Sequence, residues 1–175
     1  MVGTVDTWDA IRTRRNARDF SGRAIPADVL DRILEAGRRA PSARNRQPWD
    51  FVLVTDRDQL TELATVWQGA GHVAKSAATI AIIAPTEVDE IYTKSLYFDL
   101  GQATISMMLV AVANGVVSGH SSVRDQDQAR HVLGFPDGKF CAYLMSLGYP
   151  VQEPLKPLQR PDRRPFNEVV HYGRW

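Results

Sequence analysis

Apolar side chains recur along the 175-residue chain at two spacings, one typical of strands and the other of helices. Short runs rich in branched and aromatic residues predict buried strands, over residues 49–55, 78–84, 116–118 and 139–150. Apolar stripes at helical spacing predict helices over residues 7–15, 56–67 and 125–133. A further helix is predicted from Ile25-Pro26 to Arg39-Ala40, because the residue before Pro41 is disfavoured in a helix.

The segment from Lys94 to Asn114 has a helical composition and is apolar on nearly every side. A helix without a polar face is buried, either in a large core or against another subunit. Because the chain is short, this pattern favours an oligomer.

The C-terminal region changes in composition after the last predicted strand. Five of the ten prolines fall within residues 150–165, so this segment is predicted to run extended. It ends in apolar anchors, Phe166, Val169, Val170, Tyr172 and Trp175. Such an arm is expected to lie along its own domain or along a partner.

The composition is that of an ordinary globular domain, with 44% hydrophobic and 23% charged residues. The formal net charge of +1 argues against a general nucleic-acid binder, which needs a basic excess. Cys141 is the only cysteine and lies in a core-like run, so we expect an inert buried thiol and no disulfide. We find no leader pattern and no run of about 18 apolar residues, which predicts a cytoplasmic protein without a membrane span.

The basic residues are mostly arginine, since only four of the 21 are lysines. Genome composition is one explanation, and bidentate recognition of a phosphate or planar group is the other. Three clusters stand out: TRRNARDF at 13–20, RRAPSARNRQPW at 38–49 and RPDRRPF at 160–166.

The stretch GAGHVAKS at 69–76 imitates phosphate-binding motifs but stands in the wrong context. Such motifs need a strand before the loop and a helix after it, whereas here a helical pattern precedes and a strand pattern follows. The four histidines are scattered without metal-ligand spacing, and SGHSS at 118–122 is not a nucleophile elbow.

Several motifs in order along the chain resemble the FMN-dependent nitroreductase family. RRNARDF is followed by IPADVLDRILEAGRRAPSARNRQPWDFVLV, and then come LYFDLGQATISMMLVAVANGVVSG, VLGFPDG, YLMSLGYP and RRPFNEVVH. The resemblance covers nearly the whole chain.

The resemblance implies that the first arginine cluster wraps an FMN. Arg14 is expected to hold the phosphate, with Arg15 and Asn16 around the ribityl chain. Arg18 is expected near the pyrimidine edge, where a cation stabilises the negative charge of the reduced flavin. Asn16 departs from the serine often found at its position.

Three further segments are implicated by the resemblance. One reaches the flavin from the other subunit and contains Pro41, Ser42, Asn45 and Gln47. A second lies along the ring near its reactive nitrogen and contains Ser118, Gly119, His120 and Ser121. In the arm, Arg163, or else Arg164, closes on the phosphate. We expect Arg12, Arg38, Arg39 and Arg44 to be surface charge, and Asp99 to cap or pair within the core.

The implied fold is a single α+β domain over residues 1–175, a three-layer sandwich with a mixed, mostly antiparallel sheet. Two copies would form an intertwined homodimer embraced by the arm of residues 150–175. The implied activity is an oxidoreductase that uses NADH or NADPH to reduce nitroaromatics or quinones, by a ping-pong mechanism with chemistry carried by FMN. Other flavin chemistry, such as dehalogenation or flavin breakdown, and flavin binding without turnover remain as alternatives.

Overall fold

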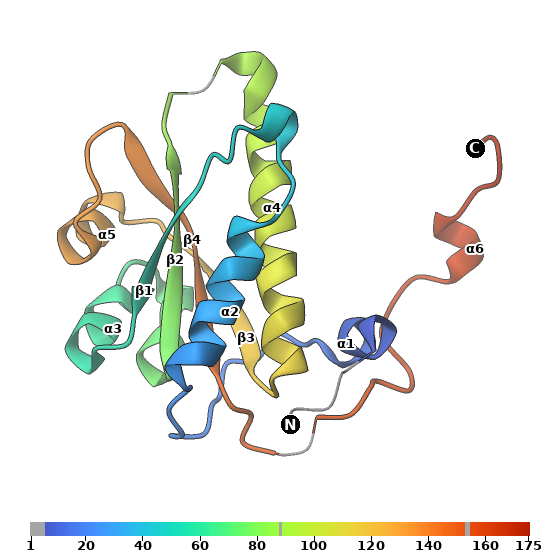
Figure 1. Cartoon of the computed structure of the whole chain (residues 1–175), viewed down its shortest axis with the longest axis horizontal. Helices are drawn as coiled ribbons and strands as arrows, with labels where there is room; N and C mark the ends of the chain where they lie inside the picture. The colour runs from blue at the N-terminus through green and yellow to red at the C-terminus, as the bar shows by residue number, and fades with distance from the viewer. Residues whose placement is uncertain (1–5, 88, 153–154) are drawn as a thin grey trace.

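A four-stranded sheet forms the centre of the protein (Figure 1). The computed structural model describes residues 6–87, 89–152 and 155–175. The strands are β1 (Asp50–Val54), β2 (Ala78–Pro85), β3 (Val117–Ser122) and β4 (Lys139–Gly148), in the spatial order β1-β2-β4-β3. All three pairings are antiparallel. Among the described residues, the one parallel pairing is the isolated bridge between Asn16 and Ser118 at the outer edge of β3.

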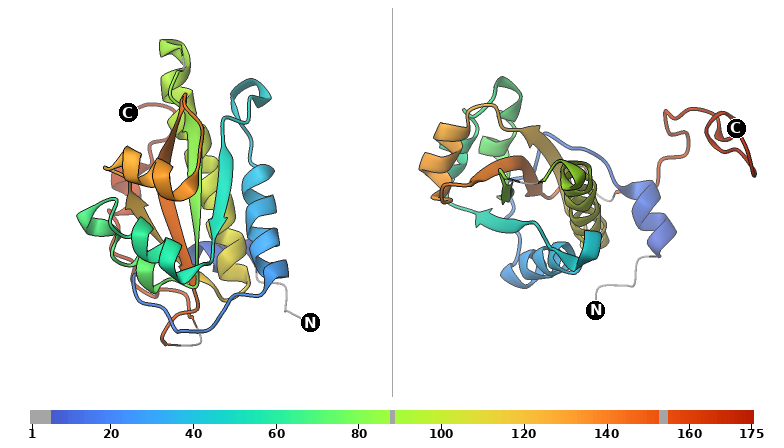
Figure 2. Two further views of the ribbon diagram at one scale, coloured as in Figure 1. Left: turned by 90° about the vertical axis from the view of Figure 1, so that its left-hand side faces the viewer. Right: turned by 90° about the horizontal axis from the view of Figure 1, so that it is seen from above.

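Helices cover both faces of this sheet, as Figures 1 and 2 show. On one face lie α2 (Ala27–Arg38) and α4 (Glu90–Ala113), and on the other α3 (Arg57–Leu63) and α5 (Gln126–Leu133). Alternate residues of β2 serve the two cores: Ile80 and Ile82 join one apolar cluster, Ala81 and Ile83 the other. The predicted three-layer sandwich is therefore confirmed.

Element boundaries differ from the sequence predictions where local signals were weak. The first helix, α1 (Thr7–Thr13), begins after Asp6, whose side chain accepts hydrogen bonds from two backbone amides. The helix α3 ends at Leu63, and two short turns, η2 (Gln68–Ala70) and η3 (Val73–Lys75), lead into β2. β3 is twice the predicted length, and α6 (Phe166–Val169) adds one helical turn to the arm.

The long helix α4 is apolar on two faces, of which the structure buries one. Residues at helical spacing face the sheet and α2 and are buried: Leu96, Leu100, Ala103, Met107 and Ala111. Tyr97, Phe98 and Ile105 are 51%, 69% and 42% exposed. By length and composition α4 is apolar enough to cross a membrane, but its buried face packs as that of a core helix.

The C-terminal arm leaves the sheet beside α1 and extends away from it (Figure 1). The amide of Leu158 donates to the carbonyl of Arg12 at 3.2 Å, and the Arg15 side chain donates to the Lys156 carbonyl. Beyond these contacts, Phe166, Tyr172 and Trp175 are 68%, 84% and 98% exposed. The described part of the arm has no regular secondary structure apart from α6, and Phe166, Tyr172 and Trp175 are not covered by other described residues.

Candidate functional site

The segment from Arg14 to Arg18 runs along the outer edge of β3. Its central contact is a hydrogen bond from the Ala17 amide to the Ser118 carbonyl at 2.8 Å. Next to it, Gly119 packs so closely that an added Cβ would clash with the Ala17 carbonyl oxygen. A glycine is therefore needed where the two segments meet. The structure thus brings together the first arginine cluster and the 118–121 segment, which the resemblance assigned to one cofactor.

In the part of the chain that the structure describes, the arginines of this segment have no acidic partner. Arg14 makes one long contact, 3.4 Å from its Nη1 to Asn16 Oδ1, and Arg18 is exposed. Within the described residues, no carboxylate lies at ion-pair distance from Arg14 or Arg18. Both guanidinium groups are therefore available to an anionic ligand.

Other arginines of the sequence clusters are neutralised locally, as expected for surface charge. Arg12 pairs with Asp9, while Arg38 and Arg39 both pair with Glu35 at 2.6 Å. The hydrogen bonds that Arg38 and Arg39 donate to Glu35 lower the pKa of its carboxyl group to about 2. These three arginines stay outside the site.

Two histidines lie beside the arginine segment and are linked to each other. His72 Nε2 lies 3.2 Å from the His120 carbonyl oxygen, and His72 Nδ1 lies 2.6 Å from Ser146 Oγ. Burial lowers the pKa of His72, the hydrogen bond to the His120 carbonyl opposes this, and the charge of Arg18 lowers it further. Burial and the charges of Arg14 and His72 lower the pKa of His120. Both shifts favour the neutral imidazole, so the positive charge here comes from arginine.

Sequence reasoning missed this pair because no local spacing connects them. His72 and His120 are 48 residues apart, and Ser146 is 74 residues from His72. They meet because the turns before β2 pack against β3, a contact with no signature in the sequence.

An apolar groove of about 400 Å³ runs between α4 and the sheet. Its walls are mostly side chains of α4, closed by two residues of the sheet: Tyr97, Leu100, Gly101, Thr104, Ile105, Met108, His120 and Tyr143. His120 Nε2 is buried without a hydrogen-bond partner among the described residues. An apolar groove with one unsatisfied polar atom fits a flat ring that carries polar groups on its edge.

The second predicted segment, residues 41–47, is held in an unusual backbone conformation. Arg44, Asn45 and Gln47 have φ angles of 54°, 56° and 51°, in the left-handed region that is costly for non-glycine residues. Ser42 stabilises this loop, because its Oγ accepts a hydrogen bond from the Gln47 amide at 2.9 Å. Such strain is typical of binding sites and persists only where the surroundings enforce it.

Two side chains of α4 anchor the same loop. Asp99 is 3% exposed, and its Oδ2 accepts a hydrogen bond from the Ala43 amide at 3.0 Å, so it pairs within the core as expected. Tyr92 accepts a hydrogen bond from Arg44 at 2.8 Å and stacks under Arg46 at 3.3 Å. The expectation that Arg44 is merely surface charge is incomplete, since its side chain is tied to α4.

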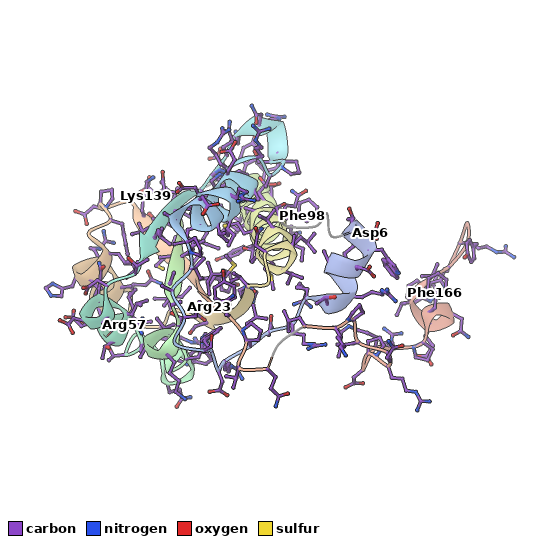
Figure 3. The ribbon with its side chains drawn as sticks, turned by 60° about the horizontal axis from the view of Figure 1, so that its bottom comes forward. Asp6, Arg23, Arg57, Phe98, Lys139 and Phe166 are labelled. Atoms are coloured by element: carbon purple, nitrogen blue, oxygen red, sulfur yellow. The ribbon has the colours of Figure 1, made fainter. Side chains whose placement is uncertain are left out.

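One chain does not bring all the predicted site residues together. The loop with Pro41, Ser42, Asn45 and Gln47 lies beside the start of α4, whereas residues 14–18 pass near its end (Figure 1). Arg163 and Arg164 lie on the arm, where Arg163 donates to the Asp162 carbonyl and Arg164 lies 3.6 Å from Glu168. Figure 3 shows that Phe166, on this arm, stands well away from the sheet. Among the described residues, no hydrogen bond or ion pair joins the three groups.

Comparisons with known proteins agree with this fold. The model of the nitroreductase family matches residues 11–149. A putative NADH dehydrogenase/NAD(P)H nitroreductase of Archaeoglobus fulgidus is 30% identical, covering 94% of this chain and 96% of that protein. An iodotyrosine deiodinase of Hydra vulgaris is 23% identical over 94% of this chain and 72% of that protein. The solved structure of an FMN-dependent nitroreductase from Clostridium difficile superposes with a TM-score of 0.82 at 22% identity, covering 96% and 99% of the two chains.

Proposed function

The chain belongs to the nitroreductase family, and on that basis we propose that it is an FMN-dependent oxidoreductase that uses NADH or NADPH to reduce small acceptors such as quinones and nitroaromatics. The placement of two arginines is the structural observation that best supports this proposal. Arg14 and Arg18 have no acidic partners among the described residues and are held on the edge of β3. The charge of Arg14 acts on His120, which lines the apolar groove, and Arg18 lines a neighbouring cleft with His72.

The residues present fit FMN. Arg14 would bind its phosphate, a charge-assisted contact that an arginine makes well. Arg15 and Asn16 would bind around the ribityl chain, and the buried Nε of Arg15 lacks a hydrogen-bond partner among the described residues. Ser118, Gly119, His120 and Ser121 would lie along the ring. When bound, FMN supplies the transfer of an electron pair, while the protein supplies position and electrostatics.

Arg18 would stabilise the reduced form of the flavin. Its guanidinium group would lie at the pyrimidine edge of the ring, where two-electron reduction leaves negative charge. A fixed cation stabilises that charge without reorganisation. Since the lowered pKa values of His72 and His120 favour their neutral forms, this task falls to Arg18.

A second copy of the chain would complete the site. Pro41, Ser42, Asn45 and Gln47, together with Arg163 or Arg164, would come from the partner of an intertwined homodimer. The separation of these groups within one chain and the exposed apolar residues of α4 and the arm support this assembly. Each subunit would be a single domain over residues 1–175, in a cytoplasmic protein.

Steady-state kinetics test the proposed activity. One groove that serves donor and acceptor in turn leads to ping-pong behaviour, with parallel double-reciprocal lines as the quinone or nitroaromatic is varied. Anaerobic mixing with NADH or NADPH alone should bleach the bound flavin, and the acceptor should restore its colour. Intersecting lines would contradict the shared groove, and failure of both nicotinamides to bleach the flavin would contradict the reductase activity.

Reductive dehalogenation is a second candidate, favoured by the similarity to the Hydra deiodinase over nearly the whole chain. The same reduced protein, mixed with a halogenated phenol, distinguishes the two. Release of halide coupled to flavin oxidation, with no oxidation by quinones, would replace the first proposal.

A further inference from the structure

The GAGHVAKS stretch, whose context does not fit a phosphate-binding motif, places one side chain against the strand β3 of the proposed flavin site. His72 lies between η2 and η3 and is only 5% exposed. Its ring reaches β3 through the His120 carbonyl and β4 through Ser146, which is fully buried. Both ring nitrogens are therefore engaged by groups of the sheet.

The hydrogen-bond partners define the protonation of the ring. The His120 carbonyl only accepts, so His72 Nε2 carries a hydrogen. In the neutral imidazole, Nδ1 then accepts from the Ser146 hydroxyl, and the 2.6 Å distance is shorter than the 3.2 Å from that hydroxyl to the Gly119 carbonyl. The neutral Nε2–H form thus satisfies every atom of the pair. Arg18, Asp19 and Lys75 line the cleft of about 380 Å³ beside the ring, and His120 is the other titratable neighbour.

This network supports the part of β3 that carries the arginine segment. β3 is the outermost strand of the sheet, so its free edge needs partners. The Ala17 amide donates a hydrogen bond to the Ser118 carbonyl. His72 Nε2 donates one to the carbonyl of His120, two residues further along β3. Between them, a Cβ on Gly119 would lie 3.3 Å from His72 Cε1 and 3.2 Å from Ser146 Oγ. The imidazole and the hydroxyl pack directly beneath the junction of β3 and residues 14–18.

We infer that His72 is a positioning residue for the flavin site, acting with Ser146 to fix residues 118–120 and, through them, Arg18. This inference rests on the proposed function. Without the ring, the edge of β3 loses a hydrogen bond and a packing surface at the point where Arg18 and the 118–121 segment meet. Both would then be less well placed for the oxidised and the reduced flavin.

Three substitutions distinguish a positioning role of His72 from a general contribution to folding stability. His72→Leu removes both hydrogen bonds, His72→Gln keeps one donor and one acceptor, and Ser146→Ala removes the partner on β4. Ser76→Ala is the matched control, because Ser76 is equally buried in the same turn region but bonds to Val73 and Thr79 and not to β3.

We expect His72→Leu to weaken FMN binding about tenfold and to lower the midpoint potential of the bound flavin, because Arg18 stabilises the reduced form less. Ser146→Ala should change both in the same direction, and His72→Gln should stay within a few fold of the wild type. In the FMN-free protein, amide exchange at Ala17 and residues 118–121 should accelerate in His72→Leu and not in Ser76→Ala.

A folded His72→Leu protein with unchanged FMN affinity, potential and amide exchange would overturn the inference. If His72→Leu does not fold, Ser146→Ala provides the test. The inference is overturned if Ser146→Ala changes FMN affinity and midpoint potential no more than Ser76→Ala does. A wild type that binds no FMN would refute the proposed function instead, and the exchange measurement on the free protein would still test the role of His72.

Discussion

Arg14 and Arg18 differ from neighbouring arginines in their surroundings more than in their exposure. Arg12, Arg38 and Arg39 each lie against an acid of their own helix, so their charge is already compensated. Arg14 and Arg18 follow the end of α1 in an extended segment. They therefore lack the acid one helical turn away that pairs with each of the other three arginines. Their charge is left for a ligand.

Arg14→Ala therefore should weaken FMN binding by roughly ten- to a hundredfold, the equivalent of about 1.5–3 kcal/mol for one charge-assisted hydrogen bond. Arg163→Ala should do the same if the arm closes on the phosphate. Titration of the FMN-free protein, followed by flavin fluorescence, measures both. Arg39→Ala is the control and should leave the affinity unchanged; equal losses at Arg14 and Arg39 would mean that the phosphate lies elsewhere.

Among the elements, the loop of residues 41–47 depends most on one anchor. Asp99→Ala removes the carboxylate that accepts a hydrogen bond from the Ala43 amide. It also removes the acceptor of a 3.3 Å hydrogen bond from Gln102, whose side chain also donates to the Pro41 carbonyl. We expect a loss of about 1–3 kcal/mol in the free energy of unfolding, since a partly buried amide is left without its partner. The left-handed residues of the loop should relax, and FMN affinity should fall with them.

Urea unfolding and FMN titration of Asp99→Ala measure the two effects, with Asp31→Ala on the exposed surface of α2 as the control. Lower stability with unchanged FMN affinity would show that the loop does not reach the flavin.

The elements show what the sequence could predict. Apolar patterning placed all four strands and the helices up to α5 in the right parts of the chain, with shifted boundaries. It succeeded because both faces of β1, β2 and β4 pack in apolar cores. Periodicity failed at the end of α3, where Trp67 continues the apolar pattern although the helix has stopped. It also missed the one-turn helix α6 and the left-handed loop, whose conformation comes from contacts with Asp99 and Tyr92 far along the chain.

The candidate site was predicted unevenly for the same reason. Arginine clusters and the SGHSS stretch stand out in the sequence, and the structure places Arg14–Arg18 against Ser118–Ser121. The link from His72 to Ser146 could not be predicted, because the two residues lie in separate stretches of the sequence and their contact depends on how the turns before β2 pack. Whether residues 41–47 and Arg163 join the same site depends on a second copy of the chain.

At the scale of the whole molecule, the exposed face of α4 and the apolar end of the arm support the proposed partner subunit. A chain that ends after Tyr149 loses the arm and its contacts with Arg12 and Arg15. We expect it to lose dimerisation and FMN together, as measured by light scattering and flavin content, with circular dichroism to report its folding. A truncated chain that remains a folded, yellow monomer would contradict the shared site.

The absorbance spectrum of the purified full-length protein tests the central claim most directly. A flavin held by Arg14 and Arg18 at the edge of β3 should make the protein yellow, and denaturation should release FMN and not FAD, because the site offers cations for one terminal phosphate and the sequence has no motif for an adenosine half. A colourless protein that cannot be reconstituted with added FMN would contradict it.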